Sequence, residues 1–226
     1  MSEVVVVAVD GPAGSGKSSV SKAVARRLGY AYYDTGAAYR ALAWAAVNAG
    51  IDLQSEDAVV AVQDSAEYVA SHDPDHQVFH VDGVDVTEAI RGHEVSGSVS
   101  HIARHPRVRQ GLVDHFRSVI SACSYPGIVM EGRDITTVVA PDAQVRVLLT
   151  ADEEVRIARR QAELAGVTAE PVAESLKARD RSDQSVVDFM NAAPGVALLD
   201  SGPLTFGQTV DAMLSLIDEA LGGTDE

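Results

Sequence analysis

Cysteine is nearly missing from this sequence, since Cys123 is the only one among 226 residues. A single thiol cannot form an internal disulfide, so the sequence excludes a disulfide scaffold and predicts a cytoplasmic protein in a reducing compartment. No motif that would activate a nucleophilic thiol surrounds Cys123, which disfavours cysteine-based catalysis.

Long apolar runs are missing as well, because no stretch approaches the roughly 18 residues typical of a membrane-spanning helix. The run Val4–Val9 has no basic region before it and ends at Asp10, so it is typical of a strand and not of a signal peptide. We therefore expect no membrane association.

Positive charge is scarce: 18 Lys and Arg face 33 Asp and Glu, a net charge of −15. A protein of this charge lacks the broad basic face that nucleic acid requires, so any phosphate must be bound by local clusters. Only 3 of the 18 basic residues are Lys and the other 15 are Arg, whose guanidinium suits phosphate oxygens. Codon usage in a GC-rich genome would produce the same ratio.

Strand and helix patterns alternate along most of the chain. Val4–Val9 is a β-branched run typical of a strand buried on both faces of a parallel sheet. Further strands are predicted at 31–34, 128–131, 145–149 and 196–199. Helices are predicted at 17–28, 37–49, 56–70, from 106, 150–165, 170–180 and from 205 onward. This order predicts an α/β fold with a five-stranded parallel sheet and helices on both faces.

One segment interrupts the alternation. The pair Asp82-Gly83, flanked by strand patterns at 77–81 and 84–87, predicts a β-hairpin. We interpret the region of about 61–104 as an inserted subdomain.

A phosphate-binding loop follows the first strand. The eight residues match G-x-x-x-x-G-K-[ST] in full and precede a helix; they are Gly11, Pro12, Ala13, Gly14, Ser15, Gly16, Lys17 and Ser18. Glycines let successive N–H groups point at one anion, and the helix dipole adds positive potential. We expect this loop to bind ATP, Lys17 to reach the β- and γ-phosphates, and the Ser18 hydroxyl to ligate Mg²⁺. Ser19 either contacts the α-phosphate or lies on the helix surface.

The sequence disfavours a switch protein or a motor. It contains neither D-x-x-G nor N-K-x-D, which a GTPase requires, and it is short for a large ATPase motor. The remaining class is a kinase for a small acceptor, in which several arginines would converge on a second phosphate.

Four segments in order resemble bacterial cytidylate kinases. They are Asp34–Ala41, which fits D-[ST]-G-x-x-Y-R, then His105–Arg109, Glu131–Asp134 and Arg179–Asp183. The resemblance runs from Val4 to about Leu221. It implies a single P-loop kinase domain over 1–226, with a core of about 1–60, 105–150 and 167–226, the 61–104 insert binding the monophosphate, and a lid of about 151–166.

The resemblance also implies a reaction. ATP would phosphorylate CMP, and dCMP as a second acceptor, with Mg²⁺ as cofactor. Other P-loop kinases, for adenylate, uridylate or shikimate, are the alternative, and a nucleotide-binding regulator without turnover is a second one. The acidic surface and the lack of an obvious dimer helix favour a monomer.

By resemblance, Arg40 and Arg133 bind the CMP phosphate, and Asp134 accepts from the cytosine amino group. Arg109 donates to the ring carbonyl, and Ser100 contacts the base. Alternatively, Arg40 is a surface residue, and Arg133 and Asp134 pair with each other.

Other candidate residues carry two readings each. Thr35 either donates to phosphate or, more simply, caps the following helix, and Tyr39 packs against the base or in the core. Arg179 and Asp183 contact phosphate and ribose hydroxyls by resemblance, or form an i,i+4 ion pair.

Three arginines share the helix predicted after the fourth strand: Arg156, Arg159 and Arg160. By resemblance they belong to the lid that closes over ATP, and Arg156 and Arg160 join Lys17 and Arg133 as catalytic candidates. Alternatively, they form a solvated face balanced by neighbouring acidic residues.

Two positions depart from the family pattern. Thr136 stands where a glycine is common, which leaves the conformation of its loop open. Gln184, Ser185 and Val186 follow Asp183 where the family often carries a further arginine, so that phosphate contact is absent or supplied elsewhere.

His72, His76 and His80 are spaced by four, but Pro74 breaks a common helical face, so we interpret them as surface residues.

Overall fold

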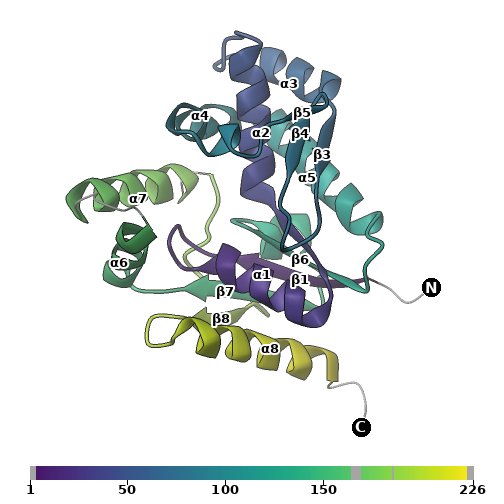
Figure 1. Cartoon of the computed structure of the whole chain (residues 1–226). Coiled ribbons are helices and arrows are strands. Elements are labelled where there is room, and N and C mark those ends of the chain that lie inside the picture. The colour runs from purple at the N-terminus through teal and green to yellow at the C-terminus, as the bar shows by residue number, and fades with distance from the viewer. Residues whose placement is uncertain (1–3, 164–168, 185, 223–226) are drawn as a thin grey trace.

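A computed structural model describes residues 4–163, 169–184 and 186–222. Its centre is a five-stranded parallel sheet (Figure 1) in the order β2-β6-β1-β7-β8. The strands are β1 (Val5–Asp10), β2 (Ala31–Asp34), β6 (Gly127–Gly132), β7 (Val145–Thr150) and β8 (Ala197–Asp200). The predicted α/β fold is therefore confirmed, and the end of β1 leads directly into the phosphate-binding loop.

Helices cover both faces of this sheet. Val7 and Val9 of β1 pack on α1 (Lys17–Leu28) and α8 (Phe206–Gly222). The alternate residues Val6 and Ala8 pack on the other side, in the core that includes α2 (Thr35–Asn48) and α5 (Pro106–Ser121). Because successive side chains of a strand point to opposite faces, burial on both sides explains the continuous apolar run.

The region 61–104, which the sequence predicts to be an insert, contains a second sheet, of three strands in the order β3-β4-β5. The hairpin of β4 (Phe79–Val81) and β5 (Val84–Asp85) is confirmed, with Asp82 and Gly83 at positive φ. The helix predicted at 56–70 was too long. The observed α3 (Glu56–Ser65) ends where Ala66 turns extended, and β3 (Tyr68–Ala70) pairs antiparallel with β4.

The rest of the insert is helical, with a 3₁₀ turn at Ala89–Arg91 and α4 (His93–Ala103). The three histidines do not share a face: the His72 ring packs edge-on against Tyr33, His76 contacts Asp73, and His80 lies on β4.

Two helices, α6 (Glu153–Glu163) and α7 (Ala169–Gln184), follow β7 and pack on one another. Ile157 of α6 and Val172 and Leu176 of α7 enclose Ala13 of the phosphate-binding loop. The helix predicted at 170–180 is longer than expected, because α7 continues to Gln184. Residues 164–166 of the predicted lid lie outside the described residues. Among the described helices, none has the length and apolarity needed to cross a membrane.

Candidate active site

The phosphate-binding loop joins β1 to α1, as predicted. Gly16 caps α1 with a left-handed backbone of φ 90°, which favours glycine. At Gly11, a Cβ atom would collide with the carbonyl oxygen of Leu149 on β7, so only glycine fits. Ser19 is exposed on α1, which agrees with its reading as a helix-surface residue.

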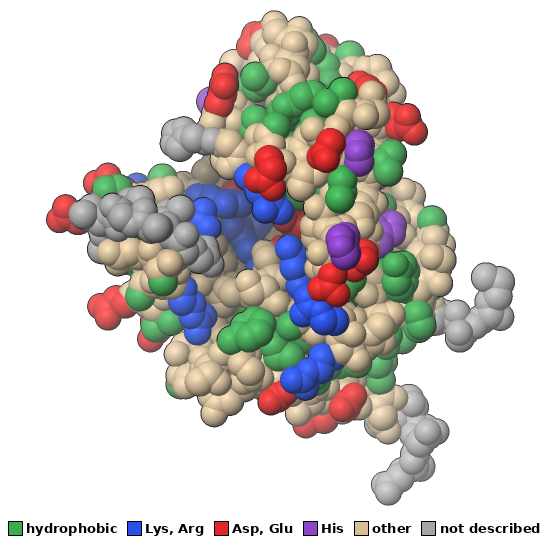
Figure 2. All heavy atoms as spheres, in the orientation of Figure 1, with side chains coloured by type: hydrophobic (Ala, Val, Ile, Leu, Met, Phe, Trp, Pro, Cys, Tyr) green, Lys and Arg blue, Asp and Glu red, His purple; other side chains and the backbone are tan. Residues whose placement is uncertain are grey.

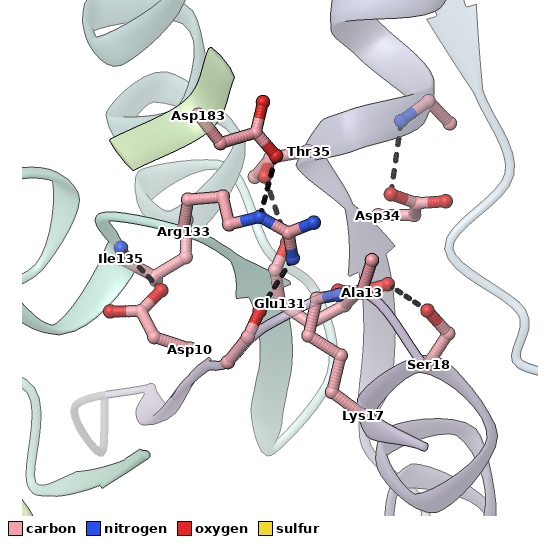
Figure 3. Close-up of polar contacts among 12 residues, drawn as sticks. Asp10, Ala13, Lys17, Ser18, Asp34, Thr35, Glu131, Arg133, Ile135 and Asp183 are labelled. Carbon is pink, nitrogen blue, oxygen red and sulfur yellow. Dashed lines mark hydrogen bonds and ion pairs between the residues drawn. The ribbon is translucent and has the colours of Figure 1, made fainter. Parts of the chain in front are cut away.

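Lys17 and Ser18 meet a buried carboxylate at the end of β6. Ser18 Oγ donates to Glu131 Oε1 at 2.5 Å, and Lys17 Nζ lies 3.8 Å from Glu131 Oε2 (Figure 3). Tyr32 also donates to Glu131, at 3.1 Å. Our sequence reasoning assigned Glu131 no role. The signal was a charged residue in the otherwise apolar stretch 128–131, whose strand lies beside β1.

Burial dominates the protonation of this cluster. Desolvation, together with the positive charge of Arg133, lowers the pKa of Lys17 to about 8, although Glu131 opposes the shift. Desolvation and then Asp34 raise the pKa of Glu131, against the attraction of Lys17. An added anion would stabilise the charged lysine, which is what a site awaiting phosphate requires.

Asp34, at the end of β2, positions the start of α2. Its carboxylate accepts from the N–H of Ala37 at 2.9 Å and from Arg40 Nη2 at 3.0 Å. Burial alone would raise its pKa, yet Arg40, the Ala37 N–H and Lys17 hold that pKa below its ordinary value. The expectation that Thr35 caps this helix was wrong, because Asp34 is the cap and the Thr35 hydroxyl donates to the carbonyl of Glu131 at 2.8 Å.

Arg133 follows β6 and spans the site. Its Nε donates to Asp183 Oδ2 at 2.9 Å and its Nη1 to the carbonyl of Gly11 at 2.5 Å (Figure 3). The adjacent Asp134 accepts instead from Arg109 Nη2 at 3.1 Å. The alternative in which Arg133 and Asp134 pair with each other was therefore wrong.

Three arginines converge from three elements: Arg40 of α2, Arg133 after β6 and Arg179 of α7. Desolvation and the charges of Arg133 and Arg40 lower the pKa of Arg179, and Asp183 opposes this shift. Arg179 is nevertheless exposed at the surface of α7. Figure 2 shows Lys and Arg side chains gathered in a hollow between α7 and the insert. The positive charges of the three arginines repel one another, so the arrangement favours a bound anion.

Two arginines of α6 hold the phosphate-binding loop by its carbonyl groups. Arg156 is buried, with Nη1 donating to the carbonyl of Ala13 at 2.9 Å and to Asp180 Oδ2 at 2.5 Å. Arg159 donates to the carbonyl of Ser15 at 3.2 Å. The alternative of a solvated arginine face was wrong for these two residues, because Arg156 is buried and Arg159, which is half-buried, bonds to Ser15 and Ser201. Arg160 is exposed, and its catalytic role stays a prediction.

Comparison with known proteins places these site residues within a sequence family. The sequence model of the family described as cytidylate kinase matches residues 7–219. The chain belongs to the cytidylate kinase family. A cytidylate kinase of Cutibacterium acnes is 46% identical over 219 residues, which cover 96% of this chain and 97% of that protein. One of Streptomyces avermitilis is 42% identical over 216 residues, or 95% of this chain and 93% of that protein.

Among solved structures, an uncharacterized protein from Eubacterium ventriosum aligns with a TM-score of 0.54 at 12% identity. The alignment covers 95% of this chain and 98% of that one, and it shows a shared fold only. The reaction of the cytidylate kinase family is CMP phosphorylation with ATP. The chain is therefore a nucleoside monophosphate kinase, and the adenylate, uridylate and shikimate alternatives are disfavoured.

Two predicted base contacts of this cytidylate kinase differ in their placement. The Tyr39 ring packs against Phe116 at 6.2 Å between centroids, which agrees with the core reading. Burial, and next the charge of Asp134, raise the pKa of Tyr39, so its hydroxyl stays neutral close to the Arg109–Asp134 pair. Ser100 is exposed on α4 and donates to Gly97 of its own helix, so its contact with the base stays a prediction.

Asp10 is a second residue of this kinase that sequence reasoning passed over. Its buried carboxylate accepts from the N–H of Ile135 at 2.8 Å, the N–H of Thr136 at 2.9 Å and the Thr136 hydroxyl at 2.6 Å. These bonds fix the π-helical turn Ile135–Val139 directly after Asp134. Burial nevertheless raises the pKa of Asp10. Thr136, where the family commonly has glycine, thus anchors its loop.

Proposed function

We propose that this chain transfers the γ-phosphate of ATP to CMP, and to dCMP as a second acceptor, in pyrimidine nucleotide metabolism. The observation that carries the proposal is the convergence of Arg40, Arg133 and Arg179 beside the phosphate-binding loop, with the Arg109–Asp134 pair next to them. A P-loop supplies one phosphate site. The arginines supply a second, as a phosphotransferase with a phosphate acceptor requires.

The donor site uses the loop backbone and Lys17. Backbone N–H groups and the start of α1 present positive potential to the ATP phosphates. The ammonium of Lys17 lies 3.8 Å from Glu131, and we propose that the γ-phosphate becomes its main partner. Arg156 and Arg159 of α6 donate to carbonyls of the phosphate-binding loop, so we propose that this helix helps to close the site over ATP. Arg160 is proposed to reach the transferring phosphate from the lid.

The residues present fit a magnesium ion. Ser18 Oγ and Glu131 Oε1 are 2.5 Å apart, and both are the hard oxygen ligands that Mg²⁺ prefers. No cluster of three or more metal-ligating side chains occurs among the described residues, which suits an ion held mainly by water and phosphate. When bound, Mg²⁺ would neutralise charge on the phosphate oxygens.

The acceptor phosphate is proposed to bind between the three arginines. Arg133 Nη2 and Arg40 Nε are buried, and in the described part of the chain neither atom has a hydrogen-bond partner. Buried donors of this kind are costly unless a ligand satisfies them. The attacking oxygen of CMP is already anionic, so positioning and charge neutralisation suffice and no general base is needed. Arg179 and Asp183 complete this side of the cleft.

The base is proposed to be read by Asp134 and Arg109. A carboxylate accepts from the exocyclic amine of cytosine, and the guanidinium donates to the ring carbonyl. Burial raises the pKa of Asp134, and Arg109 opposes that shift and favours the ionised acceptor. Uracil presents an acceptor where cytosine presents a donor, so Asp134 would disfavour UMP.

Broader properties of the chain belong to the same proposal. The region 61–104 acts as the monophosphate-binding insert and 151–166 as the lid. The single cysteine supports a cytoplasmic enzyme, and the acidic net charge of −15 supports a monomer that does not bind nucleic acid.

The test is ADP release from ATP and Mg²⁺ with CMP, dCMP, UMP, AMP and GMP offered separately. We expect stimulation by CMP and dCMP above the other three. Stimulation by UMP or a purine nucleotide instead would overturn the roles of Asp134 and Arg109. Release that no acceptor stimulates would overturn the kinase proposal.

A further inference from the structure

The segment 186–189, which follows α7, lies against the acceptor site. The N–H groups of Val186 and Val187 both donate to the carbonyl of Asp183 at 3.1 Å, so the chain turns immediately after the helix. The segment 186–189 carries no positive charge, yet it contacts two of the arginines assigned to CMP.

The first contact is with Arg109. Its Nη1 donates to the carbonyl of Val186 at 3.2 Å, while its Nη2 donates to Asp134 at 3.1 Å. Two acceptors on different segments fix the plane of a guanidinium. The 186–189 segment therefore already takes part in orienting the Arg109–Asp134 pair.

The second contact is with Arg133. The Phe189 ring is 1% exposed, and its centroid lies 4.8 Å from Cζ of Arg133. This is the distance of a cation–π interaction, in which the negative face of the ring attracts the guanidinium. A buried aromatic ring thus covers one face of the charged group.

The edges of the Arg133 guanidinium are also constrained. Nε donates to Asp183 and Nη1 to the carbonyl of Gly11, as Figure 3 shows. In the described part of the chain, Nη2 is buried without a partner. With one face and two edges held, Nη2 is the donor left for an incoming anion.

Such restraint matters because an arginine side chain has many rotamers. Ordering it during binding weakens affinity, and a protein that orders it beforehand avoids that loss. We propose that Phe189 is a positioning residue, which holds Arg133 ready for the acceptor phosphate. The inference rests on the proposed binding of the CMP phosphate by Arg133.

The experiment changes the ring without emptying its site. Phe189→Leu keeps apolar bulk but removes the aromatic face. A chain with pentafluorophenylalanine at position 189 keeps nearly the same shape but abolishes the negative face, and 4-fluorophenylalanine weakens it in part. Met190→Ala is the control, because Met190 is the next residue but its side chain is 39% exposed.

We expect the KM for CMP to rise about 3- to 30-fold in Phe189→Leu and in the pentafluoro chain, with a smaller rise in the 4-fluoro chain. The dissociation constant of CMP, measured by calorimetry, should rise in parallel. The KM for ATP should stay within about twofold of wild type, and Met190→Ala should behave as wild type.

An unchanged KM for CMP in the pentafluoro chain would overturn the inference, and so would an equal rise in the KM for ATP, which would indicate general loosening. In both cases wild-type stimulation by CMP would leave the proposed function standing. Wild-type enzyme that CMP does not stimulate would overturn both.

Discussion

Lys17 shows how the phosphate-binding site is prepared at the scale of single residues. It lies close to Glu131 and Arg133 in a crowded pocket, and desolvation lowers its pKa from 10.5 to about 8. The unliganded enzyme therefore loses this positive charge at a pH at which ordinary lysines keep theirs. Phosphate groups would restore the charged form, so ATP binding and protonation of Lys17 are linked.

This linkage predicts a pH dependence. As pH rises through about 8, Lys17 of the free enzyme loses its proton. The value of kcat/KM for ATP should therefore fall by about tenfold per pH unit at higher pH. In the ATP complex the pKa is raised, so kcat at saturation should stay level to beyond pH 9. Initial rates between pH 6.5 and 9.5 check this, with Lys17→Arg as the control whose charge persists. A flat kcat/KM profile would contradict the lowered pKa.

Asp134 carries the next prediction. Asp134→Asn keeps the size of the side chain but removes the negative acceptor and adds an amide donor. The CMP/UMP ratio of kcat/KM should fall about 10- to 100-fold, the size expected for a charged hydrogen bond. The exposed Asp142, changed to Asn in the same way, should leave the ratio unaltered. If the ratio stays at the wild-type value in Asp134→Asn, base recognition lies elsewhere.

Residue identities were more predictable than residue partners. The motifs identified Lys17, Arg133 and Asp134 because each stands at a fixed distance from a glycine or a strand. The pairs Arg133–Asp183 and Arg109–Asp134 join segments far apart in sequence, so only the folded chain determines them. Asp10 and Glu131 were overlooked because they end apolar strands and act through tertiary hydrogen bonds.

At the scale of elements, α7 connects the two substrate sites. Asp180 accepts from the N–H of Ala13 at 3.1 Å and from Arg156, while Asp183 accepts from Arg133. Positions three apart lie on the same side of a helix, so one face of α7 contacts both the ATP loop and an acceptor arginine. A shift of α7 must therefore be felt at both sites.

Asp180→Asn tests this connection. It leaves Arg156 buried without its counter-charge, for which a loss of about 3 kcal/mol is expected. The Tm should fall by roughly 6–12 °C for a chain of this size. The KM for ATP should rise more than that for CMP, because Asp180 contacts the ATP loop. Asp211→Asn, at an exposed ion pair with Arg27, should change neither quantity. Equal stability of the two variants would refute the buried pair.

The prediction of elements succeeded for the core and was less complete in the insert. Buried parallel strands appear in the sequence as continuous β-branched runs, and glycines such as Gly29 mark the ends of helices. The core elements can therefore be predicted from short stretches of sequence. Strand β3 is three residues long and exists because β4 pairs with it. Its residues alone look like the continuation of α3, and only the hairpin beyond them makes the extended form favourable.

At the scale of the whole molecule, the parallel sheet was predictable but the strand order was not. Alternation of strands and helices implies parallel strands with helices on both faces. Which strands are neighbours depends on crossover lengths and packing over the whole chain. In the observed order, β1 pairs with β6 and β7, and β2 pairs with β6.

That order bears on how the protein is made. The ribosome releases β1 and β2 first, yet neither strand is hydrogen-bonded to the other, and their shared neighbour β6 begins only at Gly127. A chain halted after residue 126 should therefore show no ATP-dependent protection from protease, whereas the chain of 226 residues should. ATP-dependent protection of the shorter chain would contradict this. Until β6 has been synthesised, the chain contains the phosphate-binding loop but not the parallel sheet that holds the loop in place.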